Sequence, residues 1–415
     1  MLRRGVLAAL AVLFVTLGTS GSIAAQGTAA EQETVSGRAG ASGLEARLGK
    51  ALASPYVDPR QTAALAIDLR TGRLLFQRNA EVPLTPASAE KLPVAFAALR
   101  QLGSSFRFHT EVFGAGRLVG DEWQGDLYLV GHCDPTLALA DVGRLARDVR
   151  AAGIRRVSGG VVADERHYDA RRAAPGWKSS FLGIESPPLS ALVVHGVPVS
   201  GEDNSAAMAA TALSLALSRR GVFLAGEPRT GRTPRKVVQL AVDHSPRLSV
   251  IVQNMNRVSD NFVAEMLLKE LGASETGRGS TRSGARVVRQ TLASAGVRVD
   301  GVRIADGSGL SSLDRLTARA LVDLLRTADS DPAVRRDFVS SLPVAGVSGT
   351  LRNRLGSSPT HRRVIAKTGT TSRACALVGF VGRRYAFAIL QNGSPVSYWS
   401  ARAAQDRFVT VLARL

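Results

Sequence analysis

The sequence predicts an α+β fold in which helices flank an antiparallel sheet and a β-rich segment is inserted between the two halves of that sheet. Near the start, Thr62–Asp68 and Arg73–Gln77 are strand-like and are joined by a turn. Near the end, Val364–Thr370, Ala374–Val381 and Tyr385–Gln391 form three more strand candidates. Helical patterns separate these two sets of strands, so we expect a layered fold of helices on a sheet.

The first residues have the pattern of a secretory signal peptide. A short basic start is followed by an apolar run from Gly5 to Leu17 and by small residues up to Ala25. Residues 26–43 are rich in Gly, Ala, Ser and Thr without apolar periodicity, which is typical of a flexible leader. We expect an exported protein, in the periplasm or in the extracellular space of the cell wall, with cleavage near Ala25. An uncleaved membrane anchor is the alternative.

The middle of the chain differs in character from its two ends. Residues 106–242 carry helical patches at residues 142–152 and 206–219 and short β-like segments, which are Thr110–Val112, Leu127–Val130 and Val157–Val162. This block separates two helix-rich parts, so we predict a domain inserted into a catalytic domain whose two parts are residues 44–105 and 243–415.

The charge of the chain favours anionic partners. Lys and Arg number 53 against 34 Asp and Glu, which gives a net charge of +19. Lipid headgroups at a membrane surface and acidic wall polymers are therefore candidate partners. Nucleic acid is not expected, because no nucleic-acid-binding motif is present and aromatic residues make up only 5% of the chain.

Cysteine and histidine spacing gives no indication of a metal or a cofactor. The six histidines are scattered, and Cys133 and Cys375 are the only cysteines. We expect no metal site and no cofactor, and we expect two unpaired thiols in preference to a disulfide.

Ser88 and Lys91 form the first candidate for chemistry. They lie three residues apart at the start of a predicted helix, so they share one face and the amine can reach the hydroxyl. Only six lysines occur in the chain, and Lys, unlike Arg, can lose its proton when it is buried. Pro93 follows five residues after Ser88, which predicts a local distortion or a 3₁₀ start to this helix. Taken alone, the pair is equally compatible with a helix start that carries a solvated lysine.

Two further motifs follow in a compatible order. Ser259–Asn261 has the sequence Ser-Asp-Asn, between two predicted helices, and Lys367–Thr370 has the sequence Lys-Thr-Gly-Thr, on a predicted strand. Similar triplets begin at Arg70 and Arg229, but both precede Ser259 and so break the order. The three motifs together match the set found in penicillin-binding proteins and class A β-lactamases.

These residue types supply the groups that acyl transfer requires. Ser88 would attack a carbonyl and Lys91 would accept its proton, if burial and a neighbouring cation lower the pKa of the amine. Ser259 would pass a proton to the leaving amine. Asn261 would hold both Lys91 and a carbonyl of the substrate.

The remaining groups would bind the substrate and the developing charge. Lys367 offers a fixed positive charge for a carboxylate, and Thr368 and Thr370 offer hydroxyl contacts. Gly369 allows the substrate to approach the strand closely. The backbone N–H groups of Ser88 and Thr370 would form the oxyanion hole.

Beyond the three motifs, the chain resembles the D-alanyl-D-alanine carboxypeptidase/endopeptidase family, the low-molecular-mass class C penicillin-binding proteins, over nearly its whole length after residue 43. The resemblance also covers the following segments: Gly131–Leu137, Pro175–Trp177, Leu189–Leu192, Ser259–Glu265, Asp306–Leu310, Leu342–Gly346 and Gly349–Leu351. It implies a penicillin-recognising serine transferase/β-lactamase-like catalytic domain. It also implies cleavage of the terminal D-Ala of peptidoglycan stem peptides through an acyl-enzyme on Ser88, which β-lactams would acylate.

The chain departs from the family in three places. Leu192 is followed closely by Ala206, where many members carry a long nested insertion, Cys133 stands where glycine is usual, and His195–Pro198 replaces a more polar segment. Two alternative functions stay open. One is a serine β-lactamase or esterase on the same scaffold, although no clear equivalent of the class A deacylating glutamate is present. The other is a non-catalytic module that binds the wall or senses penicillin.

Overall fold

The computed structural model describes residues 43–195, 197 and 204–415. Residues from Leu44 to Leu415 form one compact unit. The predicted signal peptide and almost all of the predicted leader lie outside the described residues, so both stay predictions. In the part of the chain that the structure describes, no helix combines the length and the apolar character needed to cross a bilayer.

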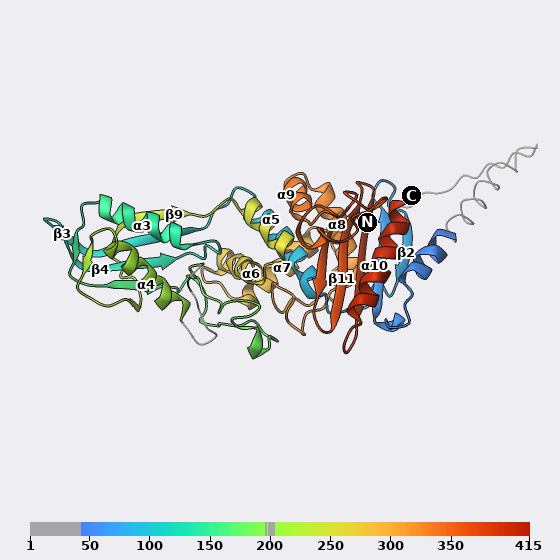
Figure 1. Cartoon of the computed structure of the whole chain (residues 1–415), viewed down its shortest axis with the longest axis horizontal. Coiled ribbons are helices and arrows are strands. Elements are labelled where there is room, and N and C mark those ends of the chain that lie inside the picture. The colour runs from blue at the N-terminus through green and yellow to red at the C-terminus, as the bar shows by residue number, and fades with distance from the viewer. Residues whose placement is uncertain (1–42, 196, 198–203) are drawn as a thin grey trace, which may run out of the picture. The chain divides into compact units, whose positions relative to one another are not determined.

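A five-stranded antiparallel sheet contains strands from the N-terminal and the C-terminal parts of this unit (Figure 1). Its strands, in the order in which they lie, are β10 (Val364–Thr370), β11 (Ala374–Val381), β12 (Tyr385–Asn392), β1 (Thr62–Asp68) and β2 (Leu74–Arg78). The predicted bounds of β1, β10 and β11 are confirmed, and those of β2 and β12 are correct to within one residue. The N-terminal and C-terminal parts of the sheet are therefore joined by the pairing of β12 with β1.

Helices cover both faces of this sheet, as the predicted α+β fold requires. Besides the helical residues 44–52, the α-helices of the unit are α2 (Lys91–Gln101), α3 (Leu139–Ala151), α4 (Ser205–Ser218), α5 (Leu248–Val258), α6 (Asn261–Thr276), α7 (Thr281–Ser294), α8 (Ala318–Ser330), α9 (Arg335–Ser341) and α10 (Tyr398–Ala413). Along β1, Ala64 and Ala66 face a core shared with α10 and with the helical residues 44–52, whereas Leu65 and Ile67 face a core shared with α2 and α8. This alternation follows from the two-residue period of a strand.

Local sequence signals position several of these helices. Thr317 caps α8 by accepting a hydrogen bond from the backbone N–H of Ala320 at 2.9 Å. The sequence analysis did not predict α7 and α9. In α7 the cap is Ser280, whose hydroxyl accepts from the backbone N–H of Ser283 at 3.1 Å, a signal that we did not use.

A second sheet is formed by residues from the middle of the chain. Its strands are β3 (His109–Val119), β4 (Glu122–Gly131), β5 (Arg156–Val157), β6 (Val161–Asp164), β7 (Phe223–Leu224), β8 (Arg229–Thr230) and β9 (Val238–His244). A separate apolar core lies between this sheet and the helices α3 and α4. The predicted β-rich character of this segment is confirmed, while its status as a domain in its own right stays a prediction.

The hairpin of β3 and β4 is much longer than the short segments that we predicted, Thr110–Val112 and Leu127–Val130. Its far half contains glycines, which weaken a strand pattern in sequence. Gly116 and Gly125 face each other across the two strands, and a Cβ on either would lie 1.9 Å from a carbonyl oxygen of the opposite strand. Pairing with the neighbouring strand, rather than strand propensity, therefore extends this hairpin.

The two cysteines are buried and unpaired, as predicted. Cys133 has a φ of 64°, in the left-handed region that glycine adopts most easily. Glycine would adopt this conformation with less strain, which agrees with the glycine that the family resemblance led us to expect here.

Candidate active site

Ser88 lies in a short 3₁₀ helix, η2 (Ala87–Glu90), which runs directly into α2 at Lys91. The predicted 3₁₀ start is confirmed, and it places Pro93 in the first turn of α2, where the missing N–H costs no hydrogen bond. Ala87 has a φ of 48°, which is unusual for a residue with a side chain. The backbone therefore bends sharply just before Ser88 and presents its N–H at the free start of a helix.

Lys91 is fully buried, and its amine makes three contacts. Its Nζ lies 3.1 Å from Ser88 Oγ, 2.8 Å from Asn261 Oδ1 and 2.6 Å from the carbonyl oxygen of Ser308. These acceptors come from three separate segments of the chain. The amine is thus held against the candidate nucleophile from several sides.

The environment of Lys91 favours loss of its proton. Burial lowers the pKa of Lys91 from 10.5 to about 8, although the nearby carboxyl groups of Asp306 and Glu265 act in the opposite direction. We expected a neighbouring cation to contribute to this effect. Burial, and not a neighbouring cation, lowers the pKa of Lys91. The charge of Lys91 instead adds to the effect of burial in lowering the pKa of Lys367. About a tenth of Lys91 is then neutral at pH 7 and able to act as a base.

The Ser-Asp-Asn motif occupies the break between α5 and α6. Ser259 ends α5 with a φ of 64°, and Asp260 caps α6 by accepting a hydrogen bond from the backbone N–H of Val263 at 2.9 Å. Asn261 begins α6, and its Nδ2 donates to the carbonyl oxygen of Glu185 at 3.0 Å. The break between the helices therefore aims Ser259 and Asn261 at the two lysines of the site.

Lys367 lies in β10, is fully buried and donates to two acceptors. Its Nζ lies 2.8 Å from Ser259 Oγ and 2.8 Å from the carbonyl oxygen of Thr368. Burial, assisted by the charge of Lys91, holds the pKa of Lys367 well below its usual value. The sequence suggested a permanently charged lysine, but this burial disfavours the charge until an anion arrives to balance it.

The remainder of the Lys-Thr-Gly-Thr motif packs against η2. A Cβ on Gly369 would lie 2.8 Å from the carbonyl oxygen of Pro86 and 3.0 Å from the backbone nitrogen of Ser88. Glycine is therefore required by the approach of η2, whereas we had expected approach by the substrate. Thr368 Oγ1 donates to Thr350 Oγ1 at 2.7 Å, and Thr370 is exposed at the end of β10. Apart from Thr370, the residues predicted from sequence are thus joined by a chain of contacts around Ser88.

Buried carboxyl groups behind Lys91 support the site, and the sequence analysis did not assign them a role. Glu265 on α6 accepts hydrogen bonds from the backbone N–H groups of Gly307 and Ser308, at 2.9 and 2.8 Å. Burial raises the pKa of Glu265 to about 8. The carboxyl group fixes the loop whose Ser308 carbonyl accepts from Lys91. Ser308, Glu185 and Thr350 are contacts that the sequence analysis also missed, although the family resemblance had included the segments Asp306–Leu310 and Gly349–Leu351.

We expect Gly309→Ala to destabilise the fold by about 3 kcal/mol or more. Gly309 has a φ of 82°, and a Cβ there would lie 1.9 Å from the carbonyl oxygen of Ala87, so η2 would have to move. Urea unfolding measures the loss. Gly153→Ala is the matched control, because Gly153 has a φ of 90° with open space around it and should cost only about 1 kcal/mol. Equal losses in the two variants would contradict the contact with η2.

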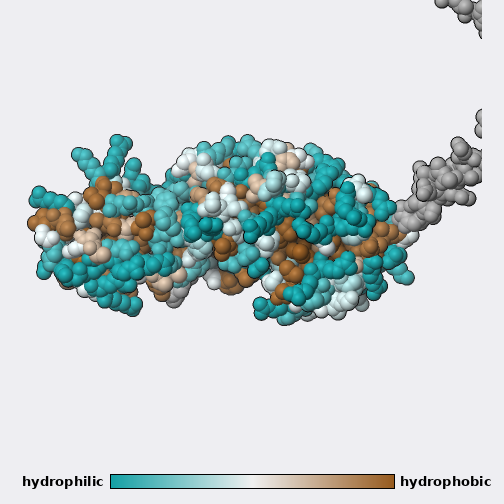
Figure 2. All heavy atoms as spheres, turned by 90° about the horizontal axis from the view of Figure 1, so that it is seen from above, coloured by the Kyte–Doolittle hydropathy of each residue, from teal (hydrophilic) through white to brown (hydrophobic). Residues whose placement is uncertain are grey.

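A cavity of about 770 Å³ lies away from Ser88. It is lined by apolar residues that include Val339, Ile365 and Phe380, with Arg335 and Arg336 among its charged residues. It contains no serine paired with a lysine, so the chemistry rather than the size of a cavity identifies the candidate site. Figure 2 shows that similar apolar patches are interspersed with polar residues over the face seen from above.

The comparisons with known proteins agree with this geometry. The model of the D-Ala-D-Ala carboxypeptidase 3 (S13) family matches residues 44–202 and 197–415. A D-alanyl-D-alanine carboxypeptidase of an Actinomadura species is 31% identical over 448 residues, covering 87% of this chain and 83% of the relative. Carboxypeptidase DacB of Mycolicibacterium smegmatis is 32% identical over 403 residues, covering 89% of this chain and 84% of the relative.

A solved structure shares the fold. The crystal structure of penicillin binding protein 4 (dacB) from Haemophilus influenzae matches with a TM-score of 0.78 at 21% identity, covering 90% of this chain and 98% of that one. The family suggested by the three motifs is thereby confirmed. The chain belongs to the D-Ala-D-Ala carboxypeptidase 3 (S13) family and is an enzyme of that carboxypeptidase class.

Proposed function

We propose that the protein hydrolyses the terminal D-Ala-D-Ala bond of peptidoglycan stem peptides through an acyl-enzyme on Ser88, and that β-lactams acylate the same serine. The observation that carries the proposal is the distance of 3.1 Å between Ser88 Oγ and the Nζ of fully buried Lys91. The names of the relatives, which are carboxypeptidases, support the substrate class. We propose an exported location, because this substrate lies outside the cytoplasmic membrane.

In the acylation step, neutral Lys91 accepts the proton of Ser88 as Oγ attacks the carbonyl carbon of the penultimate D-Ala. The carbonyl oxygen becomes negative and is stabilised by the backbone N–H groups of Ser88 and Thr370. The bond from the carbonyl carbon to the amide nitrogen then breaks. Ser259 relays the proton held by Lys91 to the leaving amine, so that Lys91 is neutral again, and Lys367, which donates to Ser259 Oγ at 2.8 Å, holds the relaying hydroxyl in place. Free D-Ala and an ester on Ser88 result, and water hydrolyses the ester.

Substrate binding uses the groups on the other side of Ser88. The carboxylate of the terminal D-Ala would pair with Lys367 and the hydroxyls of Thr368 and Thr370. An anion at this position favours the charged form of Lys367 and so offsets the effect of burial on its pKa. Asn261 Nδ2, which now donates to Glu185, would donate to a carbonyl of the stem peptide. The net charge of +19 would hold the enzyme near anionic wall polymers or a membrane surface.

We expect the second-order rate of acylation by a penicillin to rise about tenfold per pH unit below pH 8 and to level off above it. The rise follows from the pKa of about 8 for Lys91, because only its neutral form accepts the serine proton. Stopped-flow measurements, or mass spectrometry of samples quenched at set times, follow adduct formation and give the rate at each pH. The rates are corrected for the spontaneous hydrolysis of the penicillin in the buffer. A rate that stays constant between about pH 6 and pH 8 would contradict the role of Lys91.

The proposal is tested by two measurements on one preparation. The first is release of D-Ala from an acylated peptide that ends in D-Ala-D-Ala. The second is the intact mass after incubation with a penicillin, followed by peptide mapping of the adduct. We expect D-Ala release and one lasting adduct on Ser88.

Other outcomes would favour the alternatives. Rapid turnover of the penicillin without a lasting adduct and without D-Ala release would favour a β-lactamase or esterase. Binding to isolated walls without any acylation of folded protein would favour a binding module. Cleavage of cross-linked muropeptide dimers, measured in parallel, gives the contribution of endopeptidase action.

A further inference from the structure

Four of the six histidines of the chain gather where the second sheet approaches α6. His109 begins β3, His132 directly follows β4 and His244 ends β9. His109 and His244 are paired across the two strands, and the backbone N–H of His132 donates to the carbonyl oxygen of His109 at 3.3 Å. The rings of His109 and His132 stack with their centres 4.3 Å apart, and the ring of His167 lies 5.3 Å from that of His132. Antiparallel pairing therefore brings together histidines that are scattered in sequence.

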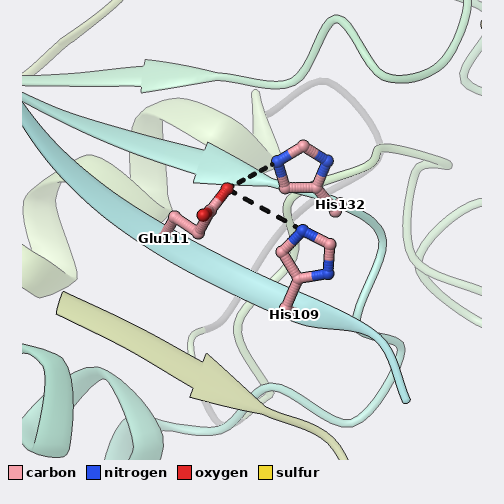
Figure 3. A group of neighbouring side chains, drawn as sticks. All are labelled: His109, Glu111 and His132. Carbon is pink, nitrogen blue, oxygen red and sulfur yellow. Dashed lines mark hydrogen bonds and ion pairs between the residues drawn. The ribbon is translucent and has the colours of Figure 1, made fainter. Parts of the chain in front are cut away.

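A carboxylate completes this group. Glu111 follows His109 by two residues on β3, so both side chains lie on the same face of the strand, opposite Val112 in the core. Glu111 Oε2 lies 3.0 Å from His132 Nε2 and 3.8 Å from His109 Nε2 (Figure 3). The three ligand atoms lie within 4.8 Å of one another.

We propose that His109, Glu111 and His132 bind a divalent transition-metal ion, with zinc as the ion that this donor set fits best. Zinc takes imidazole nitrogen and carboxylate oxygen at about 2.0–2.2 Å, which places tetrahedral ligands about 3.3 Å apart. The two measured separations, 3.0 and 3.8 Å, lie on either side of that value, so small side-chain rotations suffice. A fourth position remains for water.

The surroundings hold these side chains ready to bind. Gln239 Nε2 donates to Glu111 Oε1 at 2.6 Å, which orients the carboxylate and leaves Oε2 facing the two histidines.

The position of the site suggests what the ion would do. It would join the start of β3 to the end of β4 at the junction with α6. Beside it, His167 Nε2 lies 2.8 Å from Glu270 Oε2 on α6, the helix that begins at Asn261. We expect the ion to stabilise the junction and to raise the melting temperature without taking part in the reaction at Ser88.

Zinc titration of the untagged protein tests the proposal, by calorimetry and by competition with a chromophoric chelator. We expect one zinc ion per chain and an increase of roughly 2–5 °C in melting temperature at saturating zinc, which a chelator reverses. His132→Ala should weaken binding more than 100-fold, and Gln239→Ala roughly 10-fold. Cobalt in place of zinc should give visible absorption bands that disappear in His132→Ala.

His361→Ala is the matched control, because His361 is exposed and does not contact the three ligands. It should bind zinc like the unmodified protein. Circular dichroism shows whether each variant is folded, and Glu111→Gln, which keeps the shape of the side chain, serves where an alanine variant unfolds. Wild-type binding weaker than about 0.1 mM, or unchanged binding in folded His132→Ala and Glu111→Gln, would overturn the proposal.

Discussion

Replacing Ser88 with alanine is expected to abolish the penicillin adduct and to lower D-Ala release by about 10⁴-fold or more. Alanine removes the only atom that can form the ester, while Lys91 keeps its contacts with Asn261 and with the carbonyl oxygen of Ser308. Intact-mass spectrometry measures the adduct, and a coupled D-amino-acid assay measures release.

Ser312→Ala is the matched control for this experiment. Ser312 is an exposed serine on the loop that follows Ser308, so its loss should leave both signals unchanged. An adduct of undiminished yield in Ser88→Ala would show that another residue is the nucleophile.

Replacing Lys91 with arginine or methionine is expected to slow acylation by about 10³-fold. Arginine keeps a positive charge but cannot lose its proton, and methionine keeps the length of the side chain but has no base. The rise in rate towards pH 8 should vanish in both variants, because the group that titrates there is absent. Rates of adduct formation across pH measure both effects.

Lys269→Met is the matched control for the substitution of a buried lysine. Lys269 is fully buried on α6 and pairs with Asp169 at 2.6 Å, outside the contacts of Ser88. Its loss should lower stability but leave the acylation rate of folded protein within about threefold of normal. A comparable loss of rate in Lys269→Met would mean that the Lys91 variants report on packing rather than on proton transfer.

The sequence was most informative where a local pattern has a local cause. Strands β1, β10 and β11 were predicted to the residue, because each contains a short apolar run that lies next to a turn. Pro93 predicted the 3₁₀ start of the Ser88 helix, because proline restricts the turn that precedes it. Glycines hid the far half of the hairpin of β3 and β4, whose extension depends on a partner strand.

The sequence by itself indicated the family and predicted the residues of the candidate site. The order of three short motifs indicated penicillin-binding proteins or class A β-lactamases, and the further segments of resemblance narrowed this to the family. Tertiary structure alone decided the state of those residues. Burial in the folded chain lowers the pKa of Lys91 and of Lys367, and the loop whose Ser308 carbonyl accepts from Lys91 is held by Glu265 from another helix. In the sequence, His132 lies far from His109 and Glu111, so the spacing gave no indication of the metal site that we propose. Strand pairing brings His132 beside the other two residues. Burial and pairing between distant segments are properties of the folded chain, so no local pattern can encode them.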